Sequence, residues 1–441
     1  MSGAPLAKSR VFPGTLSRGA HAVEVSAEIG IDASGELKFD FPPIPLSNQS
    51  KFILLEWDDK DKVVHFSFRA AAEDGTRFET DHLFFSSLCT TWDQASGARL
   101  MLSALCAMGI LRFTLNEPMI KPVLRLRLRG FRSFDSLNAA CPLGQLEMMG
   151  LREDKDDNEA SGWLTIQAND PRSDPRSWRA ASERLLDHIR CIMSLTGSAY
   201  LGAPVMEFIA GIESEVTVWS KIRQGTSALA IIHYMTQEAM FEAAVRSFFS
   251  PPIEAKHLFV AIEWFSMEAT YNEVRLVNAM TALENLIDSN LGPDEALILP
   301  RAPFTRTRRV LLSVIRRCLA RLPAEQAEDA ARELNEKLAE LNRRSLLRKL
   351  ELLAARWKVP LDGIDPASLQ LAKKARDKVV HRGQYYEDVK ETDADLWIHV
   401  TVIREVVVRF LFTAIGYRGR YISHLGGYRD AAFPPTPAAP D

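Results

Sequence analysis

The sequence "PASLQLAKKARDKVVHRG", Pro366–Gly383, decides how the last part of the chain folds. Pro366 suits the first turn of a helix, and Gly383 suits the left-handed position that follows a last turn. At about 100° per residue, Ala372, Ala375 and Val379 form one apolar stripe. The segment is therefore predicted to be a helix that packs on a core through this stripe and ends at the glycine.

The polar side of this predicted helix carries Arg376, Asp377 and His381. Asp377 and His381 are four residues apart, so they are expected to be neighbours on the outward face. Arg376 lies roughly 140° around the helix from His381, at the edge of the buried stripe. The exposed carbonyls of the last turn favour a charged imidazole, and Asp377 can orient the ring and favour the same form.

Four further cations surround this group and give the helix end a positive surface: Lys373, Lys374, Lys378 and Arg382. A histidine that exchanges a proton beside guanidinium and ammonium groups suits a phosphodiester substrate. In that role Arg376 would hold a non-bridging phosphate oxygen and stabilise the charge that develops there. The plain alternative is that Asp377 and His381 form a common stabilising pair at a helix end.

Spacing alone does not single out this pair, because an arginine also precedes a histidine at Arg77…His82 and Arg418…His424. The first of these lies among strand and loop residues, and the second falls in a glycine-rich stretch beyond the last predicted helix. Only Arg376…His381 lies on an amphipathic helix, with a polar residue directly after the arginine and a glycine two residues after the histidine.

In this context, Arg376 to Gly383 resembles the RxxxxH signature of HEPN domains, and more narrowly the ApeA-like HEPN family of prokaryotic defence proteins. Three other stretches support the resemblance: "RLVNAMTALENLID", the long closing helix and "GYRGRYISHLGGY". The resemblance covers about residues 255–428. It implies a helical bundle that forms homodimers and a metal-independent ribonuclease without cofactor.

The same resemblance assigns roles to individual residues. His381 would help the ribose 2′-hydroxyl attack the adjacent phosphate, Arg376 would stabilise that phosphate, and Asp377 would occupy the polar position that is often Asn. Since Arg376 and His381 diverge around one helix, two copies about a two-fold axis would complete one site. Glu284, in "TALENLID", could lie beside this site, but a helix-surface carboxylate is the favoured interpretation.

The rest of the chain predicts an α+β protein in four parts. Residues 1–170 form a β-rich domain, with strands at "KFILLEW", "VVHFSFRA" and "VLRLRLRGF" and one helical stretch at "SGARLMLSALCAMGI". Residues 171–253 form a mixed α/β segment, in which "APVMEFIAGIESEVTVW" is a hairpin or a pair of strands. Residues 254–428 form the helical bundle, and the Pro/Ala-rich tail 429–441 is expected to be disordered.

Two arginine-rich regions are candidate anion surfaces. Residues 301–350 hold 13 Lys or Arg against 6 Asp or Glu, and this stretch includes Arg343 and Arg344. They could guide RNA through its phosphates or simply be a solvated helix surface. In "VLRLRLRGF", Arg125, Arg127 and Arg129 alternate with leucines, which favours a solvent-facing strand side over an RNA or anionic-ligand surface.

Composition excludes several classes. The net charge is −3, and five scattered cysteines lack any metal-ligand spacing, so a structural metal or a disulfide framework is not expected. "WIHVTVIREVVVRFLFTAIGY" is interrupted by Arg404 and Arg409 and does not predict a membrane span. No apolar signal peptide opens the chain, so a cytoplasmic protein is expected. His399, within that segment, is expected to be a packed histidine.

The resemblance therefore implies an endoribonuclease of prokaryotic defence or stress response that acts on RNA without a metal. The N-terminal part is expected to sense a phage-derived or cellular trigger or to restrain the nuclease. Two alternatives stay open: a catalytically inactive HEPN module that dimerises or binds RNA, and a nucleic-acid-binding regulator. Nucleotide-hydrolysis, esterase and zinc-protease motifs are absent from the sequence.

Overall fold

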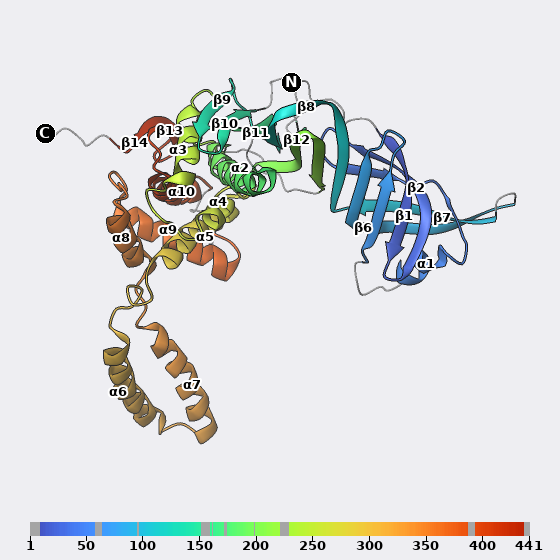
Figure 1. Ribbon diagram of the computed structural model, residues 1–441. Helices are drawn as coiled ribbons and strands as arrows, with labels where there is room; N and C mark the ends of the chain where they lie inside the picture. Colours follow the sequence, from blue (N-terminus) through green and yellow to red (C-terminus); the bar gives the residue numbers. More distant parts are fainter. Residues whose placement is uncertain are drawn as a thin grey trace. The chain divides into compact units, whose positions relative to one another are not determined.

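The chain folds as an α+β protein with a large antiparallel sheet and ten helices among its described residues. The computed structural model in Figure 1 describes residues 9–57, 64–94, 97–150, 159–160, 162–171, 174–197, 199–220, 229–386 and 393–435. Two units divide the chain, Met1–Phe249 and Ser250–Asp441. This boundary lies close to the predicted start of the helical part, and most of the predicted mixed segment 171–253 belongs to the first unit.

The first unit is built on one sheet. Its strands are β1 (Arg10–Arg18), β2 (His21–Ile31), β3 (Leu37–Asp40), β4 (Ile44–Pro45), β5 (Phe66–Ala71), β6 (Arg77–Asp93), β7 (Gly97–Cys106), β8 (Met108–Arg129), β9 (Leu137–Cys141), β10 (Gly144–Met149), β11 (Gly162–Ala168) and β12 (Gly202–Trp219). Its helices are α1 (Lys51–Trp57), α2 (Pro175–Gly197) and α3 (Glu238–Phe249). The strand order is β3-β2-β1-β5-β6-β8-β11-β10-β9, with β12 on β8 and β7 on β6 and β4.

The long strand β8 joins the two halves of this sheet. Its first part pairs with β6, its last part pairs with β11, and β12 runs antiparallel to both parts with bulges in the ladder. Phenylalanines fill the core of the first half, with Phe12, Phe66 and Phe68 almost fully buried. In the second half α2 packs against β8 and β11, and Trp178 donates a hydrogen bond to the Leu143 carbonyl (2.8 Å).

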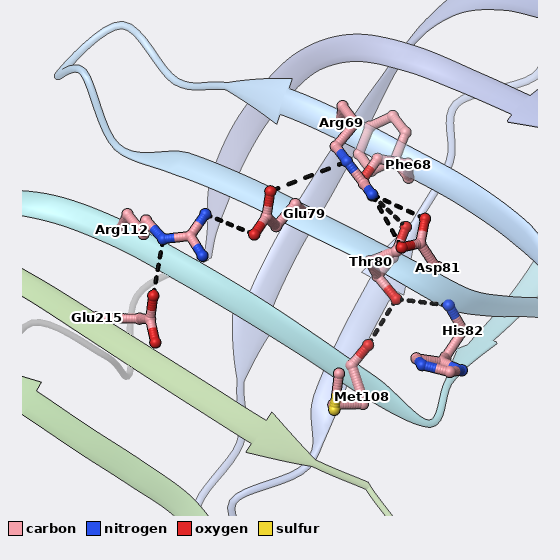
Figure 2. A network of polar contacts seen from close by, with 9 residues as sticks. All are labelled: Phe68, Arg69, Glu79, Thr80, Asp81, His82, Met108, Arg112 and Glu215. Carbon is pink, nitrogen blue, oxygen red and sulfur yellow. Dashed lines mark hydrogen bonds and ion pairs between the residues drawn. The ribbon is translucent and has the colours of Figure 1, made fainter. Parts of the chain in front are cut away.

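Cross-strand ion pairs fix the register where β5, β6, β8 and β12 meet, as Figure 2 shows. Arg112 on β8 lies between two carboxylates: it contacts Glu79 of β6 at 2.5 Å and Glu215 of β12 at 2.8 Å. Arg69 of β5 binds Asp81 at 2.8 Å and lies 3.9 Å from Glu79. Opposite charges on neighbouring strands favour this pairing over a slipped register.

The second unit is mainly helical. Its helices are α4 (Leu258–Phe265), α5 (Asn272–Asn290), α6 (Arg301–Leu319), α7 (Ala324–Glu340), α8 (Leu346–Trp357), α9 (Pro366–Arg382) and α10 (Asp393–Ile415). A two-stranded sheet of β13 (Gly419–Ser423) and β14 (Arg429–Phe433) follows. Around α10, whose described side chains are mostly buried, pack α4, α5, α8 and α9.

Several local predictions are wrong. "KFILLEW" is helix α1 rather than a strand, because a turn of hydrogen bonds between Ser47 and Ser50 leads into it and Phe52 and Ile53 enter the core. The helix predicted over 96–110 is instead β7 and the start of β8, since cross-strand pairing with β6 overrides local helical periodicity. The hairpin or pair of strands expected at 203–219 is the single strand β12.

Leucines recur at helical spacing from Leu334 to Leu353, which alone predicts one long helix, but two helices, α7 and α8, share them. Asn342 lies between the two helices: its side chain accepts a hydrogen bond from Leu299 N (2.8 Å) and donates one to the Leu299 carbonyl (2.9 Å). Ser345 then caps α8 by accepting from Arg348 N. Part of the tail predicted to be disordered is also regular, because Arg429–Phe433 pairs with β13, whereas residues 436–441 lie outside the described residues.

Candidate functional site

Helix α9 has the predicted bounds and a cap at each end. The Asp365 carboxylate accepts hydrogen bonds from Ala367 N (3.1 Å) and Ser368 N (3.2 Å), and Gly383 closes the helix at φ 78°. Ala372 and Ala375 are buried, as the apolar stripe predicts. The helix packs against α5 and α10, which fixes the direction in which its polar side faces.

Arg376 is held in place by α5. Its Nη2 donates to both carboxylate oxygens of Glu284, at 2.9 and 2.8 Å. Both contacts come from one nitrogen, so they hold Nη2 beside the carboxylate without forming a fork of two parallel hydrogen bonds. Of the two interpretations of Glu284 weighed from the sequence, the structure therefore favours a group beside the site over a free surface carboxylate.

Asp377 contacts two cations of its own helix rather than the histidine. Its carboxylate accepts from Lys373 Nζ at 2.7 Å and from Arg376 Nη1 at 3.2 Å. Partial burial raises the pKa of Asp377, but these two cations outweigh burial, so its pKa lies below the ordinary value. Among the described residues no hydrogen bond or ion pair joins Asp377 to His381, so the expected orientation of the imidazole by Asp377 is not present.

His381 lies exposed in the last turn of α9, two residues before Gly383. Within the described part of the chain, the His381 ring forms no hydrogen bond or ion pair. Arg376 is half-buried against α5, so the two side chains point in different directions around the helix, as the roughly 140° separation requires. One copy of α9 thus presents a histidine and an arginine that do not converge.

The remaining donors of Arg376 decide what it can bind. A guanidinium has five N–H groups. Two are used by Glu284 and one by Asp377, and the buried Nε has no partner in the described residues. One N–H of Nη1 is left, so a phosphate oxygen would bind through Nη1 or would displace Asp377.

The other predicted RNA contacts divide into two groups. Lys374 and Arg382 are exposed on α9, and Lys378 places its Nζ 5.4 Å from the centre of the Tyr385 ring. Arg343 and Arg344 lie instead in the connection between α7 and α8. Arg344 Nε donates to the Glu295 carbonyl (3.0 Å), and the backbone of Arg343 forms a β-bridge with Leu297.

The two competing arginine–histidine spacings lie in other settings. Arg77 and His82 belong to strand β6, and the His82 ring packs edge-on against His65 with centroids 6.1 Å apart. His424 follows β13, and its ring lies near Trp397 and Tyr428. Of the three spacings, only Arg376…His381 lies on a helix.

The arginines of β8 are less exposed to solvent than the predicted solvent-facing strand side would require. Arg125 and Arg127 share the buried carboxylate of Glu207, at 3.2 and 2.7 Å, and Arg129 is buried. Arg125 and Arg127 line a hollow of about 430 Å³ with Trp163 and other residues of β9, β10 and β11. Because Glu207 offsets part of their charge, this hollow has a weaker claim to an anion than the bare sequence indicates.

A buried polar network on α10 was not predicted. Glu405 accepts hydrogen bonds from Arg409 Nε (2.9 Å), Tyr421 OH (2.6 Å) and Ser423 Oγ (2.8 Å). Arg409 also donates to the carbonyls of residues 360 and 362. A glutamate and an arginine four apart within an apolar helix were the available signal, since buried charges are normally paired.

His399 on α10 is half-buried with its ring 6.1 Å from that of Tyr385, and partial desolvation lowers its pKa. Within the described ranges, no three His, Cys, Asp or Glu side chains lie together in a way that could hold a metal ion. In the same part of the chain, no helix is both long enough and apolar enough to cross a bilayer. Comparison with family models, with curated proteins and with solved structures finds no match to this chain.

Proposed function

We propose that the chain is a HEPN-type endoribonuclease that cleaves RNA without a metal ion, in a prokaryotic defence or stress system. Its helical part, about residues 254–428, would be the catalytic bundle. The β-rich first part would sense a phage-derived or cellular trigger or restrain the nuclease. The observation that carries the proposal is the geometry of α9, where a rigidly held arginine precedes an exposed histidine at a basic helix end.

In this proposal His381 takes the proton of the ribose 2′-hydroxyl as it attacks the adjacent phosphate, and returns a proton to the leaving 5′-oxygen. Arg376 donates from Nη1 to a non-bridging oxygen and stabilises its growing charge. Asp377 yields its contact with Nη1 when the phosphate arrives and remains bound to Lys373. Lys374, Lys378 and Arg382 attract the backbone of the RNA.

The divergence of Arg376 and His381 favours a site shared between two copies. A two-fold axis beside α9 would bring the histidine of each copy near the arginine of the other. Each phosphate would then be held by groups from both chains. The active species would accordingly be a homodimer, and dilution below its dissociation constant would abolish cleavage.

A second candidate is a HEPN module that binds partners or RNA without cleaving. The specific observation in its favour is that Arg376 already satisfies Glu284 and Asp377, so its charge has a structural use between α5 and α9. A nucleic-acid-binding regulator would share this property, and its RNA affinity would fall steeply with salt.

The test incubates total RNA with wild type and with His381→Ala, in the presence and absence of EDTA. We expect wild type to cleave in EDTA and to leave 2′,3′-cyclic phosphate ends, and His381→Ala to lose about 100-fold or more in rate. Gln370→Ala, at an exposed position of the same helix, is the matched control and should cleave like wild type. Cleavage that survives in His381→Ala would rule out the catalytic assignment.

A further inference from the structure

Helices α6 and α7 form a hairpin that has almost no buried side chain. Every residue of α6 is exposed or half-buried, and in α7 only Leu338 is buried. The two helices pack on each other, and Figure 1 shows the hairpin apart from the other helices of the second unit. Isolated helices in water are marginal without a packed apolar face. A pair of helices with so little buried surface therefore still exposes apolar side chains that a further packing partner could cover.

These exposed apolar side chains form a stripe on α6. Phe304, Leu312 and Ile315 are half-buried against α7. Beside them, Val310 is 63% exposed and Val314 43% exposed, and Leu311 is exposed as well. At about 100° per residue these three side chains lie together on a face next to the one that contacts α7. On α7 the exposed Leu334 lies next to its own packed face.

The charges of the hairpin are separated by helix. Helix α6 carries six arginines and no acidic residue, whereas α7 carries six acidic residues and only Arg332 and Lys337 as cations. Residues 301–340 are all described, and the one ion pair among them joins Asp329 to Arg332 within α7. The arginines of α6 therefore have no carboxylate partner within the described chain, although an acidic helix lies beside them.

We propose that this hairpin is a self-association surface whose occupant is the same hairpin of a second copy. The two apolar faces meet about a two-fold axis parallel to the helices, so that α6 of each copy lies over α7 of the other. Four helices then enclose Val310, Val314 and Leu334, and the basic edge of each α6 meets the acidic edge of each α7. The surface is complementary to itself in both apolar pattern and charge, which an isologous contact requires.

The acidic helix argues against RNA as the occupant. A nucleic-acid surface is basic throughout and has few exposed aliphatic side chains, since its partner is a phosphate backbone. Here the exposed valines belong to the basic helix itself, and a helix with a net negative charge lies beside it. The proposal does not depend on the ribonuclease function, because no residue of α9 takes part in it.

The first test is sedimentation velocity of the full chain over a concentration series. Wild type is expected to associate, and Val310→Glu/Val314→Glu is expected to weaken the dissociation constant about 100-fold or more, because two buried valines are lost and charges replace them. Val11→Glu, at a valine of similar exposure on β1, should sediment like wild type. Circular dichroism checks that each variant keeps its helices.

The second test reverses charge on one helix at a time. Arg306→Glu/Arg317→Glu removes basic side chains at the edge of the α6 stripe, and Glu333→Lys/Glu340→Lys removes acidic ones from α7. Each variant alone should associate more weakly than wild type, and an equimolar mixture should restore association through mixed pairs. A contact between copies through α9 would not be rescued in this way, and cleavage by His381 is read separately.

Any of three results overturns the proposal, the first two on self-association and the third on RNA binding. The first is wild type that stays a monomer at the highest concentration, and the second is Val310→Glu/Val314→Glu that associates as wild type does. The third is Arg306→Glu/Arg317→Glu that keeps wild-type association but loses salt-dependent binding to RNA, which would make the hairpin an RNA-binding element instead.

Discussion

Two arginine–glutamate pairs of the second unit differ in their burial and in the further hydrogen bonds of their polar atoms. The Arg409–Glu405 pair is buried, with side chains 5% and 3% exposed, and the glutamate also accepts from Tyr421 and Ser423. The Arg376–Glu284 pair is half-exposed, at 24% and 32%. Among the described residues, its arginine has a buried Nε without a partner, and its Nη1 contacts Asp377.

The difference separates a structural pair from one that can take a ligand. A buried, saturated network fixes one arrangement of α10, β13 and the loop before α9, because every alternative leaves a charge without a partner. A half-exposed pair is worth little to stability, since water screens it. Arg376 therefore contributes little to the free energy of folding through this pair, and it keeps an N–H donor on Nη1 for an incoming anion.

The largest expected effect is at the buried pair. Glu405→Gln keeps the shape of the side chain but leaves the Arg409 guanidinium buried without a carboxylate. We expect the free energy of unfolding to fall by about 3–5 kcal/mol, the usual cost of breaking a buried pair from one side. Urea unfolding measures the loss. A fall below about 1 kcal/mol would place this network with the weakly coupled surface pairs.

A half-buried histidine in the first unit extends the comparison to pH. His188 on α2 lies 3.0 Å from Ser247 Oγ, and burial lowers its pKa from 6.5 to about 4. Below pH 6.5 the His188 ring is protonated in the unfolded chain, whereas in the folded chain it becomes protonated only near pH 4. Stability should therefore fall as the pH drops through this window, by roughly 3 kcal/mol in total.

The measurement is urea unfolding at a series of pH values for wild type and His188→Gln. The variant is less stable at neutral pH but should lose the part of the pH slope between 6.5 and 4 that belongs to this ring. Parallel profiles for the two proteins would show that another group causes any slope.

Local signals in the sequence predicted helices α5, α9 and α10. Helix α5 has apolar residues at helical spacing, α9 has an apolar stripe with a proline and a glycine at its ends, and α10 is a long apolar run. These local signals failed at α1 and β7. Short apolar runs fit both a helix and a strand, and the choice there depends on partners far away in the chain, such as β6 for β7.

The candidate site was predictable only in part, for the same reason. The cations of α9 are adjacent in sequence, so their grouping follows from the helix repeat. The contact of Arg376 with Glu284 spans 92 residues, and sequence offered it only as the less favoured interpretation. The predicted partner of Asp377 was wrong. Lys373, Arg376 and His381 are all close enough along the helix to reach this carboxylate, and helical spacing alone does not decide which of them binds it.

The smallest stability effect is expected at the half-exposed pair, where function should respond more than folding. Glu284→Gln removes the charge that holds Arg376, and we expect at most about 1 kcal/mol of lost stability. Under the proposed ribonuclease function it should also lose at least about tenfold in RNA cleavage, because misplacing the arginine that stabilises the phosphate raises the barrier. Asp288→Asn is the matched control: Asp288 lies one turn later on α5 and pairs with Lys349 of α8 at 2.5 Å. It should cost similar stability and leave cleavage unchanged. Equal losses of cleavage in both variants would mean that α5 acts on the site only through general stability, and the distinction between the two arginine–glutamate pairs would then have no functional meaning.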